Sequence, residues 1–268
     1  MHLDNHKTAT SKKSISRAGK AILGTILLMG LGGTAMAQNM VIRSTGPSSS
    51  AYPAGKKMAN TAKITLTNQD SVTILTKGGT RVLKGPGTFS AASGKAQATG
   101  ATTRLASFIS NRGSGRARTG AVRSAGVTTV EVTPTNPNLW YLDVRKGGKF
   151  CVADAERVVL WRPDYTGSAT ASIIEPANGG VTQVVWGQGN PLKAWPREAA
   201  PITNGASYRV LASNTPNAVA VDFVVLSTNP EDVDQTAEVL IENGCQGQLD
   251  LLVEKLEGES SSSNTDQG

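Results

Sequence analysis

Residues 71–87 read SVTILTKGGTRVLKGPG, which is the pattern of a β-hairpin. Apolar and β-branched side chains fill 72–75, and a second run of the same kind follows the glycine pair at 78–79. The glycines allow the positive φ that a tight hairpin turn requires. The Gly-Pro-Gly triplet at 85–87 ends the second strand, because proline has no N–H to donate to a ladder. Similar patches before it, at 40–42 and 64–66, predict a small all-β module over 38–90.

After residue 127 the chain again carries short β-like runs, separated by turn signals at intervals of about 8–12 residues. Such spacing is typical of an antiparallel sandwich or barrel. We therefore expect an all-β, mainly antiparallel fold, with a β-sandwich-like domain over 127–256. The predicted strands lie at 128–132, 139–144, 150–152, 158–161, 169–174, 181–186, 208–211 and 219–226.

One helix is expected near the C-terminal end of that domain. Asn229 is a suitable N-cap and Pro230 suits the first turn, while the acidic residues that follow favour the positive end of a helix. Gly244 ends the predicted helix. Beyond it we expect a last strand at 249–253 and a polar, Ser-rich, disordered tail over 257–268.

The segment between the two β-rich parts, 91–126, is rich in Ser, Ala, Gly, Thr and Arg. It has too few large apolar side chains to offset the entropy of ordering, so we expect a basic flexible linker. A solvated linker is the simplest interpretation of its bases, and the alternative is a surface for anionic envelope material. The candidate binding residues here are Arg112, Arg116, Arg118 and Arg123.

The first 37 residues have the organisation of a secretory signal peptide, with a basic start, an apolar run at 21–30 and a small-residue cleavage site near Ala37. No later segment approaches the roughly 20 apolar residues of a membrane helix. We therefore expect a periplasmic or extracellular protein without a transmembrane segment after signal removal. Five of the 27 bases and one of the 20 acids lie in this segment, so the remainder carries about +3 instead of +7.

His2 and His6 are the only histidines, and both lie in the predicted signal peptide. A chain without histidine has no Ser-His-Asp or Cys-His triad and offers no imidazole to zinc. The Gly-rich runs lack the spacing of a nucleotide loop. We therefore expect a non-enzymatic protein without a cofactor or a metal.

Cys151 and Cys245 are the only cysteines. An even count in an exported chain predicts a disulfide, worth about 4–5 kcal/mol in the chain-entropy model. The alternative is a reactive thiol. It is disfavoured because neither a neighbouring histidine nor CxxC spacing is present to lower a thiol pKa.

Two kinds of side chain keep a glycan-directed alternative open. Paired carboxylates could hydrolyse a glycosidic bond if two of them converge. Trp140 and Trp161 lie on predicted strands and are expected in the core, whereas Trp186 and Trp195 flank a Gly-rich turn and are candidates for an exposed binding surface. The candidate acids are Asp143, Asp154, Glu156, Asp164 and Glu175.

The stretch from 62 to 87, with its strands at 62–66 and 70–75 and the hairpin closed by the Gly-Pro-Gly turn, resembles the FecR-like periplasmic β module. The chain as a whole resembles uncharacterised exported proteins of Gram-negative bacteria. This resemblance implies an envelope location and a β-rich interaction module, and it assigns no catalytic residue. FecR regulators also carry a cytoplasmic segment and a transmembrane helix, where this chain has a predicted cleavable signal.

Together these features predict a periplasmic or exported protein that binds or scaffolds another cell-envelope component, either an envelope protein or an anionic envelope polymer. The alternative is a secreted carbohydrate-binding or glycan-cleaving protein. Regulation of envelope signalling by protein contact is a third hypothesis. Nucleic acid is not an expected partner, since aromatic residues do not alternate with the arginines. The sequence indicates no oligomeric state.

Overall fold

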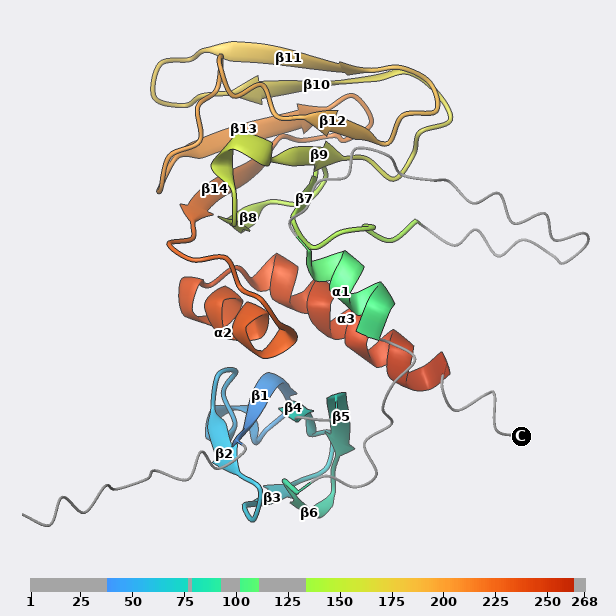
Figure 1. Cartoon of the computed structure of the whole chain (residues 1–268), viewed down its shortest axis with the longest axis vertical. Helices are drawn as coiled ribbons and strands as arrows, with labels where there is room; N and C mark the ends of the chain where they lie inside the picture. The colour runs from blue at the N-terminus through green and yellow to red at the C-terminus, as the bar shows by residue number, and fades with distance from the viewer. Residues whose placement is uncertain (1–37, 77–78, 93–101, 111–133, 263–268) are drawn as a thin grey trace, which may run out of the picture. The chain divides into compact units, whose positions relative to one another are not determined.

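The computed structural model describes residues 38–76, 79–92, 102–110 and 134–262. Within these residues the chain is mostly β-strands in sheets rich in antiparallel pairs, which confirms the predicted class, with three α-helices in addition (Figure 1). The strands are β1 (Gln38–Thr45), β2 (Lys57–Ala59), β3 (Lys63–Leu66), β4 (Ser71–Thr76), β5 (Gly79–Lys84), β6 (Gly87–Ser90), β7 (Tyr141–Asp143), β8 (Gly148–Val152), β9 (Val159–Trp161), β10 (Ala169–Ile174), β11 (Val181–Trp186), β12 (Leu192–Ala194), β13 (Ser207–Ala212) and β14 (Val219–Val225). The helices are α1 (Thr102–Ile109), α2 (Val233–Asn243) and α3 (Gln246–Ser262), with single 3-10 turns η1 (Ser49–Ala51) and η2 (Ala155–Arg157).

The predicted hairpin is present, because β4 and β5 pair antiparallel from Ser71 opposite Lys84 to Thr76 opposite Gly79. They belong to a four-stranded sheet of order β2-β1-β4-β5, and β3 pairs with β6. The Gly-Pro-Gly turn between β5 and β6 packs closely on the chain. A Cβ built on Gly85 would lie only 1.9 Å from the backbone oxygen of Thr67, so this position requires glycine.

Two further sheets have the orders β11-β10-β13-β14-β8 and β12-β9-β7 (Figure 1). They share one apolar core. Leu142 and Leu160 enter this core from the three-stranded sheet, and Ile173 and Phe223 enter it from the five-stranded sheet. This arrangement agrees with the predicted sandwich. Two features differ from the prediction: β12 was not expected, and the β14–β8 and β7–β9 pairs are parallel. The predicted strand at 128–132 lies outside the described residues.

The C-terminal region contains two helices where one was predicted. The helix α2 has Asp232 as its N-cap, and not Asn229 as expected, and it ends at Gly244 in the left-handed conformation as expected. The strand predicted at 249–253 was wrong, because α3 runs from Gln246 to Ser262. The disordered tail predicted over 257–268 was wrong for residues 257–262, and residues 263–268 lie outside the described part of the chain. The buried apolar residues of α3 recur with helical spacing, and this spacing is not visible in a stretch as short as 249–253. These residues are Leu249, Leu252, Val253 and Leu256.

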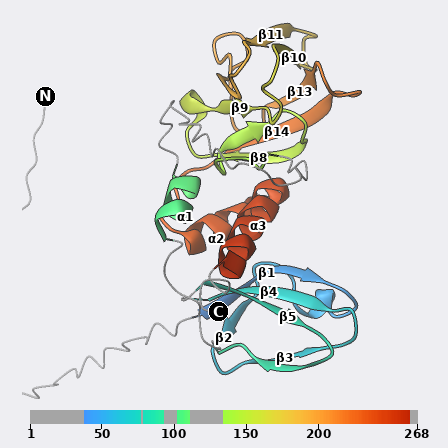
Figure 2. The ribbon, with the colours of Figure 1, turned by 90° about the vertical axis from the view of Figure 1, so that its right-hand side faces the viewer.

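The segment 91–126 also departs from the flexible linker that was expected, since part of it forms α1. The buried residue Phe108 of this helix packs in the same core as α2 and α3. Two carbonyls of α1 also accept hydrogen bonds from residues of the following domain. The indole Nε1 of Trp140 donates to the carbonyl of Ile109 at 2.6 Å, and Leu139 N–H donates to the carbonyl of Phe108. Figure 2 shows the three helices grouped together.

The strands β1 and β4 bury both of their faces, because successive side chains on a strand point in opposite directions. Val41 and Ile74 pack in a core of residues 38–92. Met40, Ile42 and Leu75 pack instead in a second core, which they share with the helices. Residues 38–90 and 134–262 are therefore parts of one compact unit that share a core, and not separate modules.

The predicted disulfide is present and joins β8 to the start of α3. Cys151 and Cys245 are fully buried, and their Cα atoms are 5.8 Å apart. On the same strand Phe150 and Val152 point into the sandwich core, so β8, like β1, separates two cores. Among the described helices, none has the length and apolar character to cross a membrane.

Candidate functional site

The four tryptophans are all in the core. Trp140 and Trp161 are buried as predicted, with 6% and 4% of their surface exposed. Trp186 and Trp195 are also buried, at 1% and 4%, so the exposed binding surface considered for them is wrong. The rings of Trp195 and Phe223 pack edge to face with their centres 5.1 Å apart, and the Trp195 Nε1 donates to the carbonyl of Ala200. The physical reason is that a sandwich with few phenylalanines fills its core with tryptophan.

The arginine cluster at Arg112, Arg116, Arg118 and Arg123 lies outside the described residues. It stays a sequence-based candidate for binding anionic material.

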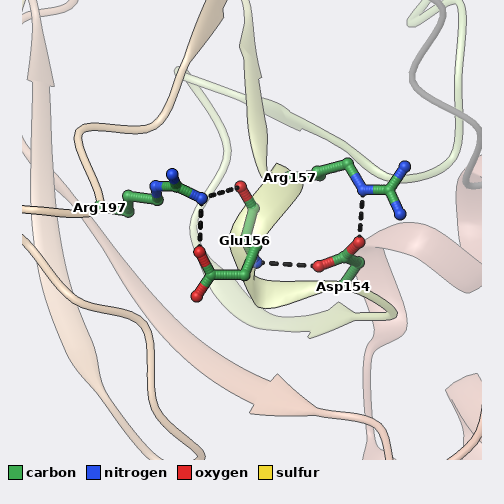
Figure 3. A network of polar contacts seen from close by, with 4 residues as sticks. All are labelled: Asp154, Glu156, Arg157 and Arg197. Atoms are coloured by element: carbon green, nitrogen blue, oxygen red, sulfur yellow. Dashed lines mark hydrogen bonds and ion pairs between the residues drawn. The ribbon is translucent and has the colours of Figure 1, made fainter.

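Two of the candidate acids belong to a polar network on η2 (Figure 3). Asp154 accepts hydrogen bonds from Glu156 N–H at 3.0 Å and from Arg157 Nε at 2.6 Å. Glu156 pairs instead with Arg197. Figure 3 shows each carboxylate facing its own arginine, so the pair does not converge on a common point.

The other candidate acids also have partners of their own. Asp164 accepts from the backbone and hydroxyl of Thr166, and these hydrogen bonds lower its carboxyl pKa below the ordinary value. Glu175 accepts from the side chain of Asn178. Within the described residues, no group of three His, Cys, Asp or Glu side chains is placed to hold a metal.

A pocket of about 230 Å³ lies between the loop joining β7 to β8 and the first turns of α3. Its walls are apolar where Leu139, Leu142 and Leu251 line it. Ligand sites are commonly apolar concavities of this kind with a few polar groups at defined positions. We take this pocket as the candidate site.

Two lysines stand beside the apolar wall. Lys146 and Lys149 are exposed and line the pocket, and among the described residues no acid forms an ion pair with either. A Cβ built on Gly244 would lie 3.7 Å from Lys149 Nζ, so this ammonium group lies at the C-terminal end of α2. The partial negative charge of a helix C-terminus favours a cation at this position. Glu254 is the one acid of the lining besides Asp143.

Asp143 and Arg145 form a paired wall of the pocket. The buried Asp143 carboxylate accepts from Arg145 Nε at 3.0 Å and from Nη2 at 2.8 Å, which is a bidentate pair. The hydrogen bond to Asp143 raises the pKa of the Arg145 guanidinium above its ordinary value. The guanidinium also lies 5.7 Å from the centre of the Trp161 ring. These contacts fix the loop and leave the positive charge of the pocket to the two lysines.

Tyr141 supplies a hydroxyl donor. It is half-buried in the lining, and the described residues make no hydrogen bond to its hydroxyl. Burial raises the pKa of Tyr141 above its ordinary value of 10.0, so the hydroxyl keeps its proton at neutral pH. It is therefore a donor and not an anion.

Gly247 leaves one side of the pocket open. A Cβ built on this residue, in the first turn of α3, meets no atom within 4 Å. A larger side chain there would enter open space beside Leu251 without a clash. The pocket therefore has an apolar wall, a tyrosine hydroxyl and two lysines, an arrangement suited to an anion attached to an apolar body.

The sequence contained a signal for this loop but not for the pocket. The run RKGGK at 145–149 places three bases around a glycine pair between two predicted strands. The opposite wall comes from Gly247, Gln248 and Leu251, which form a wall only when 246–262 is a helix. Predicting a strand at 249–253 therefore concealed the site.

Comparisons with protein-family models, with curated proteins and with solved structures find no match to this chain. The candidate site therefore rests on the geometry of its own residues.

Proposed function

We propose that this protein is a non-enzymatic periplasmic or exported binding protein, and that the pocket between the β7–β8 loop and α3 binds the anionic end of a cell-envelope component. The observation that carries the proposal is the position of Lys146 and Lys149 beside an apolar wall, without an acid partner among the described residues. An ammonium group binds a carboxylate or a phosphate by charge-assisted hydrogen bonds.

The volume of the pocket limits the part of the ligand that it holds. A cavity of about 150 Å³ accommodates benzene, so about 230 Å³ suits a body of about ten non-hydrogen atoms. An octyl-sized chain or a single ring bearing a carboxylate or phosphate has this size. A larger amphiphile would place its anionic end and the first part of its apolar chain here.

Binding without catalysis is supported by the surroundings of the acids. Asp143, Asp154, Glu156, Asp164 and Glu175 each have a partner other than a second acid. The glycan-directed alternative has lost its proposed aromatic surface, since Trp186 and Trp195 are buried. The resemblance of residues 62–87 to a FecR-like module supports the envelope setting and is itself a proposal.

The test is calorimetric titration of the chain with octanoate and octyl phosphate, with 1-octanol as the uncharged control. We expect both anions to bind and added salt to weaken them. Replacing both lysines, Lys146→Gln with Lys149→Gln, should weaken binding about tenfold or more, whereas octanol should bind poorly to every variant. Octanol binding as tightly as octanoate would remove the role of the lysines.

A matched pair of variants tests the location. Gly247→Leu should block binding, because the new side chain enters the pocket. Gly258→Leu introduces the same change in the same helix at an exposed position with no atom within 4 Å, and should leave binding unchanged. Equal loss in the two variants, or binding unaffected by Gly247→Leu, would contradict the site.

A further inference from the structure

The outer edge of β11 is an open strand edge. This strand lies at the margin of the five-stranded sheet, where it pairs with β10 over its whole length (Figure 1). Among the described residues, no backbone hydrogen bond joins Val181–Trp186 to any segment other than β10. An open edge presents unpaired N–H and C=O groups to another strand.

The other edges of the larger sheets are protected in ways that β11 is not. On the edge strand β8, the side chain of Gln248 satisfies both backbone groups of Cys151. Its Oε1 accepts from the Cys151 N–H, and its Nε2 donates to the Cys151 carbonyl. The edge strands β2, β7 and β12 have three residues each and carry a charge. The edge strand β5 carries Arg81 and Lys84. By contrast β11 reads VTQVVW, six residues without a charge or a proline.

The side chains on the outward face of β11 are apolar or neutral. Val181 and Val185 are 60% and 54% exposed, and Gln183 lies between them on the same face. Leu211, on β13 of the same sheet, is 37% exposed. Exposed β-branched residues on an uncharged edge are the pattern that natural proteins avoid unless another strand covers it.

We propose that β11 pairs with β11 of a second copy of this chain, antiparallel, about a two-fold axis at Gln183. Directly opposite residues in an antiparallel ladder point to the same face of the sheet. When the two strands are copies of one another, this requires the two-fold axis to pass at a residue, which then lies opposite the same residue of the other copy. With Gln183 on the axis, Val181 of one copy faces Val185 of the other, and the reverse. Each exposed valine then gains a β-branched partner.

Charge supports a second copy as the occupant. A two-fold axis brings each residue close to the same region of its copy, so a charge on the strand would meet a like charge. With no charge on β11, this repulsion is absent. The pairing would join the five-stranded sheets of both copies into one continuous sheet, and it does not depend on the proposed ligand pocket.

Sedimentation velocity over a range of concentrations tests the proposal, with circular dichroism to confirm that each variant is folded. The wild-type chain should dimerise. Gln183→Lys places two ammonium groups at the axis and should raise the dimer Kd about tenfold or more, as should Gln183→Glu. An equimolar mixture of the two variants should form dimers again, since opposite charges then meet.

The control is Thr170→Lys, which adds the same charge to the exposed face of the adjacent strand, directly opposite Val185. It should leave the dimer intact. A wild-type chain that is monomeric at every concentration would overturn the proposal, and so would a Gln183→Lys chain that dimerises like the wild type or a mixture that stays monomeric.

Discussion

The side-chain amide of Gln248 hydrogen-bonds both backbone groups of Cys151, with Oε1 2.7 Å from the N–H nitrogen and Nε2 3.1 Å from the carbonyl oxygen. A residue of α3 thereby replaces the strand that would otherwise pair with the edge of β8. Gln248 is buried and also donates to the carbonyl of Leu139. Gln248 thereby holds α3 against β8 beside the candidate pocket, whose lining it shares.

Replacing Gln248→Leu should lower the free energy of unfolding by about 2–3 kcal/mol, because buried backbone groups of Cys151 and Leu139 lose their partners. Urea denaturation measures the change. The matched control is Gln246→Leu on the same helix, where the side chain is exposed and donates a hydrogen bond to Asp250. The control should change stability by less than about 0.5 kcal/mol, and an equal effect in both variants would contradict the role of Gln248.

The disulfide should contribute strongly to stability. The double variant Cys151→Ala, Cys245→Ala removes a link between residues 94 apart, and we expect a loss of about 2–5 kcal/mol in unfolding experiments. Added reductant should destabilise the wild type toward the level of the double variant and leave the variant itself unchanged. A reductant effect on the double variant would show that another process is being measured.

Much of the β structure is predictable because its signals are local. The runs that became β10 and β11 have the predicted bounds, and the hairpin of β4 and β5 follows from its glycine pair. The helix α3 was missed because 249–253 alone fits a strand, while its helical spacing appears only when Leu256 is included. The burial of Trp186 and Trp195 depends on how two sheets face each other, which no local pattern encodes.

Trp195→Ala should destabilise the protein by about 3–5 kcal/mol, because it removes a buried ring and leaves a cavity beside Phe223 and Tyr208. Thermal and urea unfolding report the change. For comparison, Tyr165→Ala removes a ring that is 36% exposed and should cost much less. A Trp195→Ala variant with unchanged stability would restore the possibility of a surface role.

Stability should fall in acid partly because of Asp70. Burial alone would raise the pKa of its carboxyl, but hydrogen bonds from Ser48 N–H and from the N–H and hydroxyl of Thr67 outweigh burial and lower it well below 3.8. A pKa lowered by folding gives stability that is present above about pH 4 and is lost as the pH falls through the folded-state pKa.

Asp70→Asn should therefore reduce stability at pH 7 and flatten its dependence on pH below about 4. Urea unfolding across this range measures both effects. Asp222→Asn, at an exposed position on β14, should leave stability at pH 7 close to the wild type. An Asp70→Asn variant that loses stability in acid as steeply as the wild type would contradict this assignment.

The core that β1 and β4 share with the C-terminal helices also sets an order of events during folding. The ion pair between Arg43 and Asp250 joins residues 207 apart, and Met40, Ile42 and Leu75 pack against side chains of the C-terminal helices. The apolar face of β1 and β4 therefore stays uncovered in any folding intermediate in which α3 has not yet packed against these strands. A chain truncated before residue 246 should therefore aggregate, and a chaperone that binds it would protect the surface that α3 covers in the folded protein.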